Sequence, residues 1–305
     1  MTALTHELPA LLEHWLPQQR WFAAKGRPVG SVTITSVTPL LTEGEPLVDL
    51  VLVAVAFDDG SPVQHYQLVL GRRERPRGEL EHVEIGLVGG QLAYDGLWDP
   101  VITEWLLDAI REGRRVGEVA FVPEPDAELA TGYTGRVLGV EQSNTSVSWG
   151  EKSILKLFRR IYPGLNPDLE LHRALRSVGS NEVAALQGAI EGTLDGEPAT
   201  LAMVQDFAAN SADGWSMALA SVRDLLAEAD LRADEVGGDF AGEASRLGET
   251  VAVVHAELHR ALGGGERDPR DLADNWHRRL SSFAKEVPVI DEYVGAIRAA
   301  YDEVA

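Results

Sequence analysis

The residue best suited to bind an anion in this sequence is a lysine inside an apolar stretch. Lys156 lies in the run Ile154-Leu155-Lys156-Leu157-Phe158, which has the composition of a buried strand. A lysine fixed on a strand can supply positive charge to the α- and β-phosphates of a nucleotide. Taken without context, a lysine on a strand is more often a surface residue, so the neighbouring segments must decide.

A polar turn precedes this lysine by one strand. Its residues lie between two predicted strands, 135–140 and 145–149, and small polar residues leave backbone N–H groups free to face phosphate oxygens. Strand, polar turn, strand, turn and lysine strand is the layout of a kinase nucleotide lobe. We therefore predict that ATP contacts Lys156 and the turn residues Gln142, Ser143, Asn144, Thr145, Ser146 and Val147.

A carboxylate and a hinge would complete such a nucleotide site. Asn166-Pro167 predicts the start of a helix over 168–176, and Glu170 on this helix is the predicted partner of Lys156, with Glu182 as the second candidate. A further strand, 200–207, ends just before the helical region. Its last residues are predicted to form a hinge that binds adenine through the backbone, namely Gln205, Asp206 and Phe207.

Other chemistries find less support in the residue patterns. The sequence has no GxxxxGK[ST], no GxGxxG and no GxSxG, which argues against a P-loop fold, a dinucleotide fold and a serine hydrolase. His255 and His259 have the i, i+4 spacing of a metal pair, but the glutamate between them is not in the HExxH position. We interpret them as residues of a packed helix and predict no metal site.

Composition limits the partners. The net charge of −21 disfavours binding to nucleic acid or to anionic membranes, and the apolar run 50–57 is too short to span a bilayer. The absence of cysteine and of a secretory signal leads us to expect a cytoplasmic protein. A phosphate ligand would then need local positive charge, and four basic residues lie within nine positions: Lys152, Lys156, Arg159 and Arg160.

The pattern along the chain predicts three parts. Residues 1–88 form a mostly β unit, with a helix over 4–15, strands over 31–41 and 47–57, and a hairpin turn at 58–60. A second unit opens with a helix over 99–113 and continues with several strands. After Asn210 the pattern is helical, with helices over 221–229, 240–262, 271–285 and 289–305. The last helix carries no stop signal, so we expect the natural chain to continue.

Several segments together resemble the actinobacterial maltokinases. The opening Gln18-Gln19-Arg20-Trp21-Phe22-Ala23-Ala24-Lys25 is similar to the start of their cap domain. The polar turn, the lysine strand and the helix after Asn166 resemble their nucleotide-binding part. Two further segments, 213–218 and 235–243, resemble the start of their second lobe.

The resemblance implies an α+β, bilobal kinase-like fold with an N-terminal, mostly β cap domain (1–88), a nucleotide-binding part (89–207) and an incomplete helical C-terminal lobe (208–305). It implies an enzyme that uses ATP and Mg²⁺ to convert maltose to maltose 1-phosphate for α-glucan synthesis, with a trehalose-to-maltose isomerase as an expected partner. The family's catalytic loop, His-Gly-Asp-Leu-His-x-Gly-Gln, does not occur in this sequence. The catalytic residues and magnesium ligands are therefore expected outside it, and these 305 residues alone are expected to be inactive.

Two alternatives stay open. One is a non-catalytic fragment that binds nucleotide or acts as an interaction module, and the other is a kinase for another sugar, such as glucosamine. We also predict that Arg20, Trp21 and Phe22 pack the cap against the nucleotide-binding part, although an aromatic pair could equally be buried inside the cap alone.

Overall fold

The structure is a computed structural model. It describes residues 3–75, 78–129, 131–139, 143–209, 211, 213–227, 232, 235 and 240–304. Contacts divide the chain into two compact units, Met1–Leu258 and His259–Ala305. Each unit is described by itself.

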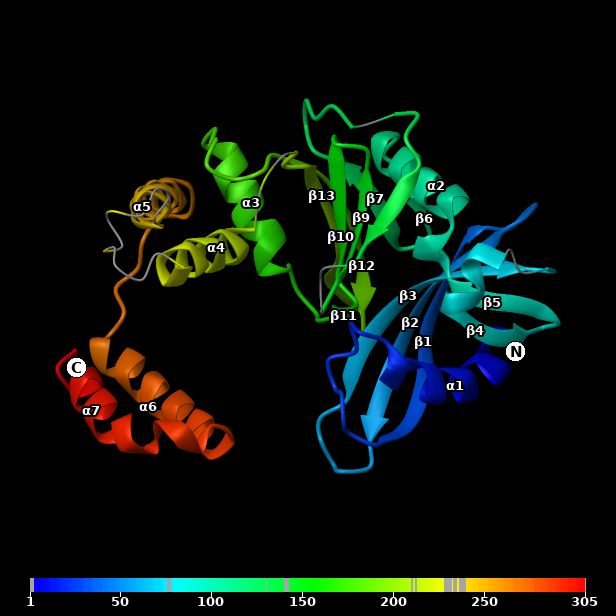
Figure 1. Ribbon diagram of the computed structural model, residues 1–305. Coiled ribbons are helices and arrows are strands. Elements are labelled where there is room, and N and C mark those ends of the chain that lie inside the picture. The colour runs from blue at the N-terminus through cyan, green and yellow to red at the C-terminus, as the bar shows by residue number, and fades with distance from the viewer. Residues whose placement is uncertain are drawn as a thin grey trace. The chain divides into compact units, whose positions relative to one another are not determined.

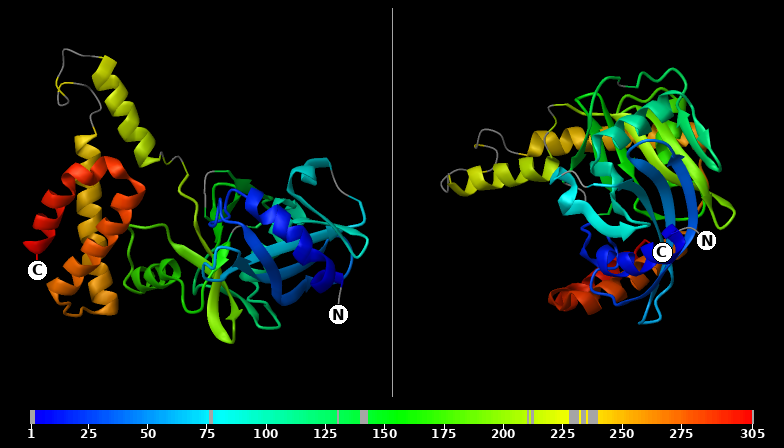
Figure 2. Two further views of the ribbon diagram at one scale, coloured as in Figure 1. Left: turned by 90° about the horizontal axis from the view of Figure 1, so that it is seen from below. Right: turned by 90° about the vertical axis from the view of Figure 1, so that its right-hand side faces the viewer.

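The first unit opens with a helix packed on an antiparallel sheet (Figures 1 and 2). Helix α1 (Ala3–Trp15) places Leu4, Leu8 and Leu12 on one face at spacings of four, and all three are buried. They pack against β1 (Val29–Leu41), β2 (Leu47–Phe57), β3 (Gln64–Arg73), β4 (Glu84–Val88) and β5 (Gln91–Asp95), in the sheet order β1-β2-β3-β5-β4. Short 3₁₀ turns lie at Leu16–Gln18, Gly78–Val83 and Gly96–Trp98.

A second antiparallel sheet follows. Its order is β6-β7-β12-β13-β10-β9-β8, built from β6 (Arg115–Val116), β7 (Val119–Pro123), β8 (Gly135–Leu138), β9 (Thr145–Trp149), β10 (Ser153–Leu157), β12 (Leu186–Leu194) and β13 (Glu197–Asp206). Helix α2 (Pro100–Arg111) packs on one face of it, and α3 (Pro167–Ser177) packs on the other (Figure 1). Helix α2 is capped at its start, because the Asp99 side chain accepts a hydrogen bond from the Val101 amide.

The chain that follows β10 joins the two sheets. After β10 of the second sheet, the short strand β11 (Arg160–Ile161) pairs with Tyr66 and His65 of β3 in the first sheet. The main core spans both sheets and α2, so the two sheets share one hydrophobic interior.

The helical region begins with α4 (Gly214–Ala227) and α5 (Ala241–Leu262). Gly263 ends α5 at a φ of +79°, and its amide donates to the His259 carbonyl. Unit His259–Ala305 contains α6 (Pro269–Glu286), a 3₁₀ turn at Pro288–Ile290 and α7 (Asp291–Asp302). Trp276 of α6 and Tyr301 of α7 have ring centroids 5.1 Å apart. Within the described residues, no helix is long and apolar enough to cross a membrane.

The predicted fold class is confirmed: the chain is α+β, with a mostly β N-terminal part and a helical C-terminal part. The bounds predicted for β2 and β9 match those observed. Strand β12 was not predicted, and the predicted boundary at residue 88 falls inside the β4–β5 hairpin, whose turn is Gly89-Gly90 at positive φ. The first sheet thus continues to Asp95, while the division at residue 207 stays a prediction.

Candidate functional site

Lys156 lies on the α3 face of the second sheet. The strand register places it opposite Ser146 of β9 and Met203 of β13. Because alternate side chains point to opposite faces, Leu155 and Leu157 enter the main core instead. The lysine therefore shares its face with a small apolar cluster made by Phe158, Leu169, Leu186, Ala189 and Met203.

The carboxylate that pairs with this lysine is Asp168. Lys156 Nζ lies 2.6 Å from Asp168 Oδ2, and both side chains are partly exposed, at 32% and 45%. The same ammonium lies 5.8 Å from the centre of the Phe158 ring. A partly exposed ion pair contributes about 1 kcal/mol or less to stability. Its main consequence is that it orients the lysine.

The prediction that Glu170 pairs with Lys156 is wrong. Asn166 caps α3, because its side-chain oxygen accepts a hydrogen bond of 2.9 Å from the Asp168 backbone amide. Asp168 thus lies in the first turn of the helix, next to the sheet. Residues two apart on a helix do not share a face, so Glu170 points elsewhere and is exposed. Glu182, the second candidate, is also exposed and is not the partner.

The polar turn is divided between two environments. Gln142 lies outside the described residues. Ser143 is exposed and Asn144 half-buried, and the Asn144 amide donates to Ser143 Oγ at 3.4 Å. Thr145, Ser146 and Val147 belong to buried strand β9.

Within β9, Val147 and Ser146 point to opposite faces. Val147 is fully buried in the main core, so its side chain cannot contact a ligand on the lysine face. Ser146 lies opposite Lys156, and its buried Oγ has no hydrogen-bond partner among the described residues. A buried polar atom without a partner is costly, which makes Ser146 Oγ the best candidate of the turn for a ligand contact.

The predicted hinge has fewer free backbone donors than expected. The Asp206 amide donates to the Ala185 carbonyl at 2.9 Å, and the Phe207 amide donates to the Lys152 carbonyl at 3.1 Å. The Asp206 carboxylate accepts from the Gln187 side chain at 2.5 Å. Gln205 lies two residues from Met203 and thus on the lysine face. An adenine contact by these residues would have to use carbonyl groups or the Gln205 side chain.

The four basic residues do not form one phosphate site. Arg159 is fully buried, and its Nη2 lies 2.5 Å from Asp95 Oδ2 of the first sheet. Burial lowers the pKa of Arg159 and the neighbouring Asp95 raises it, but a guanidinium stays charged in proteins. Arg160 lies over the Tyr162 ring in the β11 segment at 4.9 Å, and Lys152 is exposed. Lys156 alone is placed on the α3 face.

Two of the three predicted contacts of the N-terminal part are confirmed. Arg20 Nη1 donates to the Gly139 carbonyl at 3.1 Å, and the Trp21 ring lies 4.5 Å from the Arg159 guanidinium carbon. Phe22 packs inside the N-terminal part, with its ring 5.0 Å from that of Tyr66. The first two residues therefore hold the N-terminal part against the second sheet.

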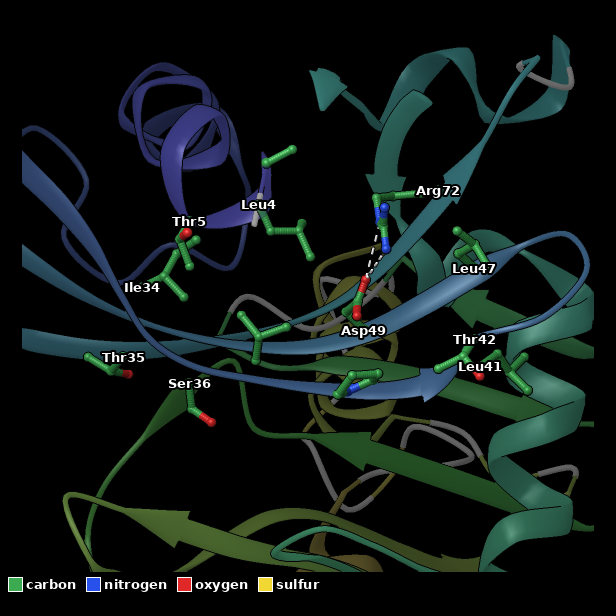
Figure 3. A pocket seen from close by; sticks show the side chains of 13 residues that line it. Leu4, Thr5, Ile34, Thr35, Ser36, Leu41, Thr42, Leu47, Asp49 and Arg72 are labelled. Carbon is green, nitrogen blue, oxygen red and sulfur yellow. Dashed lines mark hydrogen bonds and ion pairs between the residues drawn. The ribbon is translucent and has the colours of Figure 1, made fainter. Parts of the chain in front are cut away.

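A separate cavity of about 570 Å³ lies beside the start of α1 and strands β1 to β3 (Figure 3). Its walls are largely apolar, and Asp49 and Arg72 form an ion pair of 2.8 Å at one side of it. Burial raises the pKa of Asp49 and Arg72 partly counteracts this. Its lining includes no residue of the lysine site, so we regard it as a distinct feature.

Metal binding finds no support in the described residues. No three side chains of His, Cys, Asp or Glu gather there as a metal cluster, and Asp168 is already paired with Lys156.

Comparisons with known proteins place the chain among kinase-like folds. Residues 15–99 match the family model described as the maltokinase N-terminal cap domain. The chain is similar in structure to a glucosamine kinase in complex with glucosamine, ADP and inorganic phosphate, at 20% identity and a TM-score of 0.57. That match covers 96% of this chain and 64% of the other.

Two further glucosamine kinase structures match as well. Crystal form B has a TM-score of 0.59, and crystal form A has 0.56, both at 20% identity. These matches cover 96% and 98% of this chain, and 64% and 65% of the other chains. The chain thus has a maltokinase-like N-terminal part and the fold of these kinases, and spans less than two thirds of their length.

Proposed function

We propose that this chain is the nucleotide-binding portion of an ATP-dependent sugar kinase. The observation that carries the proposal is the Lys156–Asp168 pair, held between a strand and the first turn of the following helix. Ser146 lies opposite Lys156, and its hydroxyl has no hydrogen-bond partner within the part of the chain that the structure describes. A lysine held by a carboxylate of the next helix is the arrangement that positions nucleotide phosphates in kinases. The fold shared with a kinase that binds ADP supports the same assignment.

The residues proposed to bind ATP are Lys156 with Asp168, the turn residues Ser143, Asn144 and Ser146, and Gln205 to Phe207 at the end of β13. When bound, ATP with Mg²⁺ supplies the phosphoryl group. Lys156 would neutralise phosphate charge, and Ser146 Oγ would donate to an oxygen. The base and the magnesium ligands are proposed to lie outside this sequence, as are most acceptor contacts.

Maltose is the proposed acceptor, because residues 15–99 match the maltokinase cap domain. The product of this reaction would be maltose 1-phosphate. A trehalose-to-maltose isomerase is a proposed partner only if maltose is the acceptor. Glucosamine is the second candidate, since it is the sugar bound in a protein of similar fold. A cytoplasmic location is part of the same proposal.

The first test is ATP binding to the 305-residue chain by titration calorimetry. Lys156→Ala should weaken ATP binding by about tenfold or more, because a hydrogen bond between charged groups contributes roughly 1.5–3 kcal/mol. The circular dichroism spectrum should stay unchanged. ATP binding that is equal in both proteins, or absent from the unmodified chain, would contradict the proposal.

The second test is catalysis by the chain alone. Purified protein with ATP, Mg²⁺ and either maltose or glucosamine is followed by phosphorus NMR, and no sugar phosphate is expected. Phosphoryl transfer needs a carboxylate and a metal ion placed within about an ångström of the reacting atoms. Among the described residues, no group of three or more His, Cys, Asp or Glu side chains could hold a metal ion. Turnover would show that catalytic residues lie within these 305 positions.

A further inference from the structure

The cavity beside α1 contains a carboxylate in an otherwise apolar row of side chains. Strand β2 directs Val51, Val53 and Val55 into the core that it shares with α1, and all three are fully buried. Strand alternation places Asp49 next in this row. The carboxylate lines the cavity of about 570 Å³ beside the start of the helix. A buried charge costs free energy unless it is paired, so its pairing decides what the cavity can bind.

Only one of the two carboxylate oxygens of Asp49 is paired. Arg72 Nε and Nη2 both donate to Oδ2, at 3.2 and 2.8 Å, and Arg72 Nη1 donates to Gln91 Oε1 at 3.1 Å. Oδ1 accepts no hydrogen bond from the described residues. Figure 3 shows Oδ1 on the side of the carboxylate away from Arg72. Because Asp49 is only 4% exposed and lines the cavity, a molecule in the cavity can supply the missing donor.

We propose that this cavity binds a small uncharged molecule with an apolar body and a hydroxyl group. The hydroxyl donates to Asp49 Oδ1, and the body packs against the apolar part of the lining. Ligand pockets of about 300–1,000 Å³ commonly have this composition, with apolar walls and a few polar groups that fix the orientation of the ligand. The apolar residues of the lining on the α1 face are Leu4, Ile34, Val37, Pro39 and Leu47.

The charges of the lining argue against an ionic ligand. Asp49 and Arg72 are the two charged side chains of the lining, and their charges cancel. An anion would have to compete for Arg72, whose three guanidinium nitrogens already donate. A cation would lie close to the guanidinium group and would lose its own hydration. A neutral hydroxyl satisfies Oδ1 and adds no charge to a largely apolar site.

The experiment compares cyclohexanol with cyclohexanone, which has nearly the same shape but no hydroxyl to donate. Binding of each to the 305-residue chain is titrated by saturation-transfer NMR. Cyclohexanol should bind about tenfold more tightly, the effect of one hydrogen bond to a charged group. Protonated cyclohexylamine should bind more weakly than cyclohexanol. The proposal is overturned if cyclohexanol does not bind, if the ketone binds equally well, or if the ammonium binds more tightly.

A variant that fills the cavity locates the bound molecule. Val37 is a half-buried residue of β1 that lines the cavity, so Val37→Phe should remove cyclohexanol binding by occupying the space. Thr33→Phe is the matched control, because Thr33 is exposed on the same strand and is not part of the lining. Circular dichroism checks that both variants are folded. Unchanged binding in folded Val37→Phe, or an equal loss in both variants, would overturn the proposed site.

A double variant tests the acceptor. Asp49→Leu together with Arg72→Met replaces the ion pair by apolar side chains of similar size, a change that proteins often tolerate. The double variant should bind cyclohexanone as before, while cyclohexanol should lose its advantage of about tenfold. If the advantage persists, Asp49 is not the acceptor and the proposal is wrong. The comparison of the two probes on the unmodified chain does not depend on the folding of this variant.

This inference is independent of the proposed nucleotide site, since the cavity lining includes no residue of the lysine site. Val37→Phe should therefore bind ATP like the unmodified chain. A chain that binds cyclohexanol but no ATP would contradict the proposed function and support the cavity site. A chain that binds ATP but no cyclohexanol would do the reverse.

Discussion

At the scale of single residues, the site depends on which carboxylate reaches the lysine. Asp168 and Glu170 are two positions apart in the first turn of α3, and only Asp168 contacts Lys156. The two acids therefore form a natural pair of test and control, because they have the same charge and neighbouring positions but different directions.

We predict that Asp168→Asn weakens ATP binding about fivefold, equivalent to roughly 1 kcal/mol for a partly exposed ion pair. The amide keeps the size of the side chain but no longer fixes the ammonium group by charge. Glu170→Gln should bind ATP like the unmodified chain. Calorimetric titration of both variants checks this, and a larger effect in Glu170→Gln than in Asp168→Asn would contradict the assigned pair.

At the scale of elements, the start of α3 places Asp168. The Asn166 side chain accepts a hydrogen bond from the Asp168 backbone amide. The Asn166 backbone amide donates to Thr200 Oγ1 of β13 at 3.0 Å. Pro167 follows at a position where its missing N–H is not needed. The helix is thereby joined at its first residues to the sheet that carries the lysine.

We predict that Asn166→Ala lowers the free energy of unfolding by about 1 kcal/mol, the usual effect of losing an N-cap side chain. Asn166→Asp should keep most of the stability because a carboxylate also accepts from the helix amides. Asn181→Ala, at an exposed loop position, is the control. Urea denaturation measures all three, and equal midpoints for Asn166→Ala and Asn181→Ala would disprove the role of the cap.

The sequence predicts this element well and a neighbouring one poorly. Asn-Pro before an apolar pattern indicates the start of α3, but it does not say which acid of the first turn faces the sheet, since that depends on the direction in which the helix leaves the strand. Strand β12 was missed because Gly188 and Gly192 are typical of loops. In the fold they permit close packing: a Cβ at Gly188 would lie 2.7 Å from Ile110, and one at Gly192 would lie 2.9 Å from Leu201.

Arg159 shows a different limit of the sequence. The neighbouring basic residues suggested one basic cluster. However, β10 ends before Arg159, and the chain then enters β11, which pairs with the first sheet. Arg159 therefore contacts Asp95, which lies 64 positions earlier in the sequence. Such a long-range partner is set by the topology of the two sheets. The contact of Trp21 with the second sheet could be predicted only as one of two possibilities for the same reason.

At the scale of the whole molecule, the cap and the second sheet are joined by more than surface contact. Strand β11 completes the edge of β3, the Arg159–Asp95 pair is buried, and Asp99 accepts from Arg73 and Tyr94 while it caps α2. Burial and the nearby Asp99 both raise the pKa of Tyr94, so its hydroxyl remains a donor at neutral pH.

We predict that limited proteolysis releases no soluble fragment ending near residue 99. Early cleavage should instead occur at Arg267, in the exposed segment 263–268 between α5 and α6, where the chain makes no regular structure. Trypsin digestion followed by mass spectrometry checks the sites. A stable fragment of residues 1–99, with the remainder still folded, would show that the cap is an independent domain.

The pairing of β11 with β3 also affects how the protein is made. When the cap sequence has been synthesised, the segment of β3 at His65 and Tyr66 still lacks its neighbour, and Asp95 still lacks Arg159. Roughly sixty further residues must be translated before both arrive, a delay of several seconds at about 5–20 residues per second. During this interval the nascent chain exposes an unpaired strand edge and an unmatched carboxylate, so the cap can reach its final form only together with the lysine strand.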